Sequence, residues 1–117
     1  MTFNVEVLLK GEDAVVDEVV QRDGPEPDHW SDDDVREVLR LTLLSFDKVQ
    51  NPEADERSVS LRGLSWIVTP VEDGVAIAIE IPSGAVVAGP FDTDADRLTA
   101  SISRVLANPS TPSSVVH

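Results

Sequence analysis

The sequence predicts an α+β fold in which an antiparallel sheet packs against one long helix and one C-terminal helix. Apolar residues recur with helical spacing between residues 30 and 50 and again between residues 92 and 107. Between these two segments, short runs of alternating apolar residues are separated by turn sequences, which is typical of a three-stranded meander. An N-terminal strand or hairpin completes the predicted sheet.

Residues 3–10 alternate between apolar and mostly polar side chains, with the period of a half-buried strand, and Gly11 interrupts the pattern. Residues 13–21 are open to two interpretations. Their apolar pairs fit a short amphipathic helix, but the valines between residues 14 and 20 favour a strand, because β-branched side chains lose rotamer freedom in a helix. We favour the strand, which makes residues 3–21 a hairpin around Gly11 and Glu12.

The long helix has a start signal that can be followed residue by residue. Ser31 is placed to accept the free N–H of the third helical residue, and residues 32–34 are three aspartates that favour the positive end of the helix dipole. Trp30 and Val35 occupy the two positions of a hydrophobic staple. Asn51-Pro52 ends the helix, because proline disfavours helical geometry in the preceding residue.

One face of this helix is predicted to meet the sheet, since its apolar residues form a single stripe. Leu41 and Leu44 lie off that stripe. If the face of the helix opposite the sheet were exposed to solvent, these two leucines would be exposed as well. We therefore expect either another element or a second subunit to cover them. The stripe itself consists of Val35, Val38, Leu39, Thr42, Phe46 and Val49.

The meander begins after an acidic loop. Alternation starts near Val59, changes parity at Gly63, as at a bulge, and continues to Pro70, where we expect the strand to end. Asp73-Gly74 is a hairpin signal, residues 75–81 form the central strand, and residues 85–88 form the third strand.

Asp92 or Thr93 is predicted to cap the C-terminal helix, which runs to about Ala107. Residues 1–107 should therefore be a single domain, and residues 108–117 a flexible tail. Acids spaced by two between residues 92 and 96 resemble the start of a calcium loop, but Arg97 and Ser103 stand where its glycine and closing glutamate belong. Calcium binding is not predicted.

Composition excludes several classes of function. The 117 residues contain no cysteine, so disulfides and thiolate metal sites are impossible. With 22 acids against 9 bases and a net charge of −13, the surface should repel nucleic acid and anionic membranes. The N-terminus does not resemble a signal peptide and no apolar run is long enough to cross a bilayer, so we expect a cytoplasmic protein.

Few residues suit catalysis. His29 is the one histidine in the predicted domain, and the chain has no tyrosine. Glu80 lies among alanines in the central strand, where a solvent-facing role is the simpler interpretation. The sequence therefore predicts no catalytic residue, no metal site and no cofactor.

A self-association surface is predicted from small and apolar residues. The meander face opposite its isoleucines carries Ile67, Ala76 and Ala78, with almost no charge. Together with Leu41 and Leu44, this face suggests more apolar surface than one helix layer covers, and it favours a homodimer. The alternative is that the N-terminal segment folds over the face.

A partner-binding surface is predicted from charge. Eleven acids lie between Glu12 and Glu37, against only two bases. We expect any partner to dock at this acidic end, where local potentials attract basic proteins. If the acids serve only solubility, no particular acid matters. The predicted docking residues are Asp23, Glu26, Asp28, Asp32 and Asp33.

The sequence thus predicts a small acidic protein-interaction module that self-associates and has no catalytic activity. The first alternative is an acidic neutraliser or chaperone for a basic partner, such as an immunity protein or a nucleic-acid mimic. The second alternative is a small carboxylate-dependent enzyme.

Overall fold

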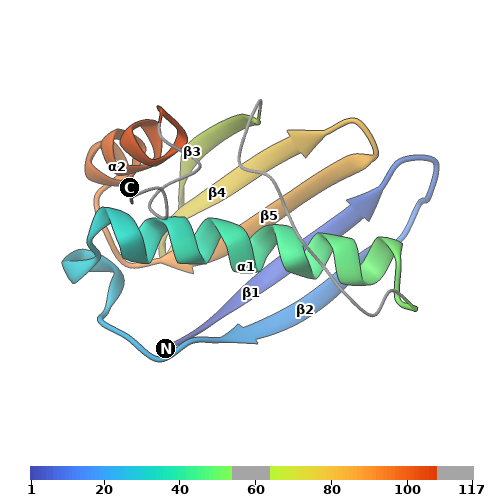
Figure 1. Cartoon of the computed structure of the whole chain (residues 1–117), viewed down its shortest axis with the longest axis horizontal. Helices are drawn as coiled ribbons and strands as arrows, with labels where there is room; N and C mark the ends of the chain where they lie inside the picture. Colours follow the sequence, from blue (N-terminus) through green and yellow to red (C-terminus); the bar gives the residue numbers. More distant parts are fainter. Residues whose placement is uncertain (54–63, 108–117) are drawn as a thin grey trace, which may run out of the picture.

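Five antiparallel strands form one sheet in the order β2-β1-β5-β4-β3, and both long helices lie on the same face of it (Figure 1). The computed structural model describes residues 1–53 and 64–107. The predicted α+β fold is confirmed. In chain order the elements are β1 (Thr2–Leu9), β2 (Val15–Gln21), the short 3₁₀ helix η1 (Pro27–His29), α1 (Asp32–Gln50), β3 (Ser65–Val71), β4 (Gly74–Ile81), β5 (Gly84–Phe91) and α2 (Ala95–Ala107).

The N-terminal segment is a hairpin, so the strand interpretation of residues 13–21 is confirmed. β2 pairs with β1 from Thr2 opposite Gln21 to Leu8 opposite Val15. On its other side β1 pairs with β5. The hairpin therefore widens the sheet, and it does not fold over the face of the meander as the alternative required.

α1 begins as predicted. The Oγ of Ser31 accepts a hydrogen bond from the backbone N–H of Asp34 at 3.2 Å, and the Asp34 carboxylate accepts one from the N–H of Ser31 at 2.9 Å. These two bonds form a capping box. Both predicted staple residues, Trp30 and Val35, are buried.

Trp30 also anchors the chain that enters α1. Its ring meets the ring of Phe91 edge-on, with centroids 5.1 Å apart, and its indole N–H donates to the carbonyl of Pro25 at 3.0 Å. The same Phe91 ring contacts Phe3, with centroids 5.2 Å apart. Side chains from β1, β5 and the α1 start thus form one aromatic cluster.

The meander is present, with two corrections. β3 continues through Pro70 to Val71, so the prediction that Pro70 ends the strand was wrong. β3 is an edge strand, where the missing proline N–H costs no ladder hydrogen bond if it faces outward. β5 extends to Phe91, beyond the predicted residues 85–88. The predictions for residues 57–63 lie outside the described residues.

The cap of α2 also differs from the prediction. Asp94, not Asp92 or Thr93, accepts the N–H of Arg97 with its carboxylate at 3.0 Å. Its backbone carbonyl also accepts the N–H of Leu98. Asp94 immediately precedes the first helical residue, the position from which a short carboxylate reaches the third helical N–H. The predicted tail at residues 108–117 lies outside the described residues.

The core lies between the sheet and the two helices. Alternate strand residues point toward the helices, including Val5, Val7, Ile77, Ile79 and Val86. Trp66 is half-buried and packs against this core. We call this side of the sheet the helix side.

Candidate functional site: the open face of the sheet

The face of the sheet opposite the helices is covered by no element that the structure describes (Figure 1). We call it the open face. Because successive side chains of a strand point to opposite faces, the strand registers define its members. They are Thr2, Asn4, Glu6 and Leu8 of β1; Val15, Asp17, Val19 and Gln21 of β2; Ser65, Ile67, Thr69 and Val71 of β3; Ala76, Ala78 and Glu80 of β4; and Ala85 and Val87 of β5.

One row of this face crosses the whole sheet. Asp17 lies opposite Glu6, Glu6 opposite Val87, Val87 opposite Ala78, and Ala78 opposite Ile67. The row is acidic at the β2 edge and apolar from β5 to the β3 edge. The N-terminal hairpin therefore adds two acids to the smooth apolar surface that the meander supplies.

Large apolar side chains are exposed on this face. Val19 keeps 69% of its surface exposed and Ile67 keeps 60%. Contiguous exposed apolar residues on a soluble protein commonly mark an interaction surface. Of the large apolar residues exposed in the described structure, those on the open face are Leu8, Val15, Val19, Ile67, Val71 and Val87.

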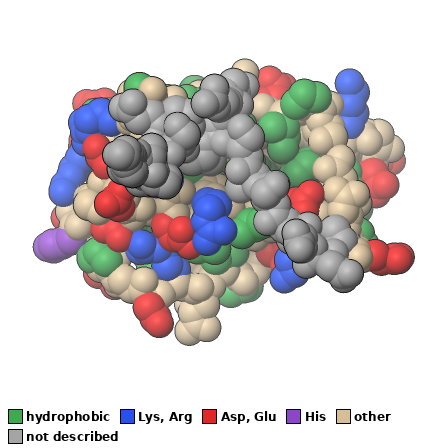
Figure 2. Space-filling view, in the orientation of Figure 1, with side chains coloured by type: hydrophobic (Ala, Val, Ile, Leu, Met, Phe, Trp, Pro, Cys, Tyr) green, Lys and Arg blue, Asp and Glu red, His purple; other side chains and the backbone are tan. Residues whose placement is uncertain are grey.

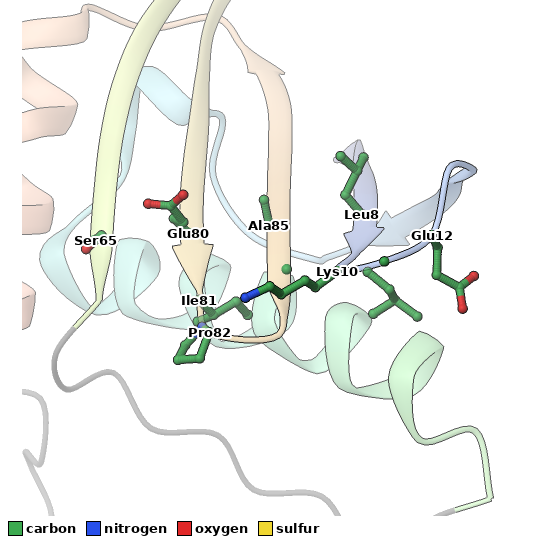
Figure 3. Close-up of a pocket in the computed structure, with 11 residues that line it drawn as sticks. Leu8, Lys10, Glu12, Ser65, Glu80, Ile81, Pro82 and Ala85 are labelled. Atoms are coloured by element: carbon green, nitrogen blue, oxygen red, sulfur yellow. The ribbon is translucent and has the colours of Figure 1, made fainter.

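Two concavities lie at opposite ends of the open face. The larger, of about 700 Å³, lies where the β4–β5 turn approaches the end of β1 (Figure 3). Figure 3 shows Leu8, Ala85, Glu80 and Ser65 lining it from four strands. Leu8 and Glu80 are exposed, so this concavity is suited to contact with another surface. The smaller, of about 300 Å³, includes Ala76 and Val87.

The two sides of the molecule differ in charge. The five strands contain no lysine or arginine, and the open face holds three acids, Glu6, Asp17 and Glu80, that form no ion pair with a described base. Acidic and basic side chains lie beside one another on the helix side (Figure 2). Each arginine in the described part of the chain forms an ion pair there or beside the α1 start: Arg22 with Asp34, Arg36 with Asp33, Arg40 with Glu37, Arg97 with Asp28 and Arg104 with Asp32.

The predicted docking acids do not form one uncompensated surface. Asp28, Asp32 and Asp33 are each paired with an arginine. Asp23 and Glu26 are exposed in the loop before η1 and have no ion pair among the described residues. Pairing therefore removes much of the negative potential that the sequence predicted for this end.

The ion pair of Asp32 connects two helices of the fold. Its carboxylate accepts hydrogen bonds from Arg104 at 2.8 and 2.9 Å and from the hydroxyl of Ser101 at 2.7 Å. The Arg104 hydrogen bonds, followed by that of Ser101, lower the pKa of the Asp32 carboxyl to about 2. Because Asp32 begins α1 and its partners belong to α2, the interaction joins the two helices.

The predicted self-association residues lie on two sides of the sheet. Ile67 and Ala78 are cross-strand neighbours on the open face. Ala76 shares that face but is buried, next to a register shift between Val75 and Ile77. Leu41 and Leu44 are half-buried on α1, and Leu41 packs against the core. The structure therefore does not join the two leucines to the open-face residues.

Sequence reasoning missed the β1 and β2 contribution to this surface. Val15 and Val19 project outward on the same strand as Val16 and Val20, so apolar periodicity alone does not distinguish the two faces. Their outward orientation follows from the pairing register with β1. The same register places Asp17 opposite Glu6.

Comparisons with known proteins give no further guide to the site. No family model, curated protein or solved structure matches the chain. None of the described helices is long and apolar enough to span a membrane. Within residues 1–53 and 64–107, no group of three or more His, Asp or Glu side chains is placed to hold a metal ion.

Proposed function

We propose that the protein is a small protein-interaction module without catalytic activity, and that it binds other proteins through the open face. The exposure of Ile67, Val87 and Val19 on one sheet face that no described element covers is the observation that carries this proposal. A sheet face gains free energy when a second layer covers its apolar side chains.

A second copy of the chain is the first candidate partner. Two open faces could pack against each other around a twofold axis and form a homodimer. If a second copy is the partner, light scattering after gel filtration at micromolar concentration should give a mass above the 12.6 kDa of one chain. Combining Ile67→Glu with Val87→Glu should return the protein to that monomer mass, because it buries two carboxylates in the contact.

A matched double variant tests the other predicted contact. Leu41→Glu combined with Leu44→Glu changes the net charge by the same amount, but places the new carboxylates on α1, on the helix side. If this pair abolishes association and the open-face pair does not, the proposal assigns the wrong surface. A parent chain that stays monomeric throughout the concentration range rules out self-association and leaves a different protein as the partner.

A basic protein is the second candidate partner. Glu6, Asp17 and Glu80 on the open face, which form no ion pair with a described base, favour it. In this form the module would be an acidic neutraliser or chaperone that covers a basic and apolar surface of its partner. We also propose a cytoplasmic location, which fluorescence localisation of the tagged chain tests.

A further inference from the structure

The inference begins with the acids at the β2 edge of the open face. Glu6 and Asp17 lie directly opposite each other on β1 and β2. Side chains at such positions have Cβ atoms about 4.5–5.5 Å apart, and like charges there repel. Both acids are exposed, and neither forms an ion pair with a described base. The fold thus places two acidic side chains at directly opposed positions on its surface.

Apolar side chains surround this pair. Val15 and Val19 flank Asp17 along β2, Leu8 follows Glu6 along β1, and Val87 lies beside Glu6 on β5. Lys10, in the turn after β1, is the described base at the rim of the face. The open face therefore presents apolar contacts around a negative centre that no described base neutralises.

We infer that this face takes an amphipathic helix whose apolar stripe is flanked by lysine or arginine, with a cationic side chain placed between Glu6 and Asp17. This inference rests on the proposed function and specifies the partner. A second copy would bring no lysine or arginine from its own strands, whereas a basic helix supplies the complementary charge. A helix also gives the sheet the same kind of layer that α1 and α2 form on its other side.

Three synthetic helical peptides of equal length serve as probes. The first alternates leucine and lysine so that it has an apolar stripe flanked by lysines. The second replaces each lysine with glutamine, and the third replaces each leucine with serine. Titration into isotope-labelled full-length protein, followed by amide chemical shifts, should show the Leu/Lys peptide binding tightest and shifting residues of β1, β2 and β5.

Two double variants that change the net charge by the same amount test whether a lysine of the peptide binds between Glu6 and Asp17. Glu6→Gln with Asp17→Asn should weaken binding of the Leu/Lys peptide by roughly tenfold at low salt, with a smaller effect as salt rises. Asp23→Asn with Glu26→Gln removes one aspartate and one glutamate from the exposed loop before η1. This control should change the affinity by less than about twofold, because those acids lie away from the open face.

Several outcomes would overturn the inference. Equal weakening by both variants would mean that net charge alone attracts the peptide. Equal affinity for the Leu/Gln peptide at the open face would preserve the proposed function but remove the requirement for a basic partner. Open-face shifts that depend on protein concentration without peptide would identify a second copy as the occupant.

Two further outcomes concern the face itself. If no peptide shifts any open-face residue, the inference fails, whereas the proposed function is tested separately by the mass of the parent chain and of its Ile67→Glu/Val87→Glu variant. If the Leu/Lys peptide binds only after residues 108–117 are deleted, the chain's own C-terminal end occupies the face, and the basic helix is not its partner.

Discussion

The guanidinium of Arg104 donates two hydrogen bonds to the carboxylate of Asp32, across 72 residues of sequence. Asp32 begins α1, and Arg104 lies in the last turn of α2. Each charge is thus at the helix end where the helix dipole favours it. The pair links the ends of two helices that share the same side of the sheet.

Lowering the pH should release this link. The pKa of the Asp32 carboxyl falls from 3.8 to about 2 in the folded protein, chiefly through its hydrogen bonds with Arg104. A lowered folded-state pKa stabilises the fold above the unfolded value and ceases to do so as pH falls through the folded value. Asp32→Asn should therefore lose about 1 kcal/mol or less near neutral pH, because exposure limits the pair.

Urea titrations of the parent and Asp32→Asn between pH 7 and pH 2 measure the difference, which should shrink below about pH 4. Asp33→Asn is the matched control, since the Asp33 side chain is 89% exposed and pairs with Arg36 on the same helix. A difference that stays constant down to pH 2 would contradict the role of the Asp32 carboxylate.

Removing the α1 cap should destabilise the protein. Ser31→Ala deletes the oxygen that accepts the N–H of Asp34, and such a loss costs about 1 kcal/mol. Chemical denaturation of the variant measures it. Ser31→Thr keeps a hydroxyl that accepts the N–H of Asp34 and donates to its carboxylate, so it should recover most of the loss. No loss in Ser31→Ala would show that this cap contributes nothing.

Trp30→Ala should cost more than the cap variant. The substitution removes a buried ring from the cluster with Phe91 and a hydrogen bond to the carbonyl of Pro25. Truncation of a buried tryptophan typically costs about 3–5 kcal/mol. Denaturant titration of Trp30→Ala and Ser31→Ala compares the free energy of unfolding that each variant loses. Trp30→Phe should lose less of this free energy than Trp30→Ala, because it keeps much of the apolar contact.

Reversing the charge of Asp17 should stabilise the fold. Asp17→Lys replaces repulsion with attraction toward Glu6 and should raise the free energy of unfolding by about 0.5–1 kcal/mol. Asp23→Lys makes the same change in net charge at an exposed loop position and is the control. Equal gains for both variants would assign the effect to net charge rather than to the cross-strand position.

Some of the structure was predictable because its interactions are local. Ser31 and Asp34 lie within one helical turn, so the residues that start α1 also bond to one another. Alternation along β4 and the Asp73-Gly74 turn likewise predicted the hairpin from adjacent residues. Pro70 was misinterpreted because its effect depends on whether a strand lies at the edge of the sheet.

The sequence by itself determined the helices, the meander, the acidic balance and part of the apolar surface, including Ile67 and Ala78. Only the tertiary structure placed β1 between β2 and β5 and both helices on one side of the sheet. In the tertiary structure, Asp28 and Asp32 form ion pairs with arginines of α2, whereas Glu6 and Asp17 have no described base as a partner. Composition counts these charges, but which of them are compensated depends on distances between side chains that are remote in sequence.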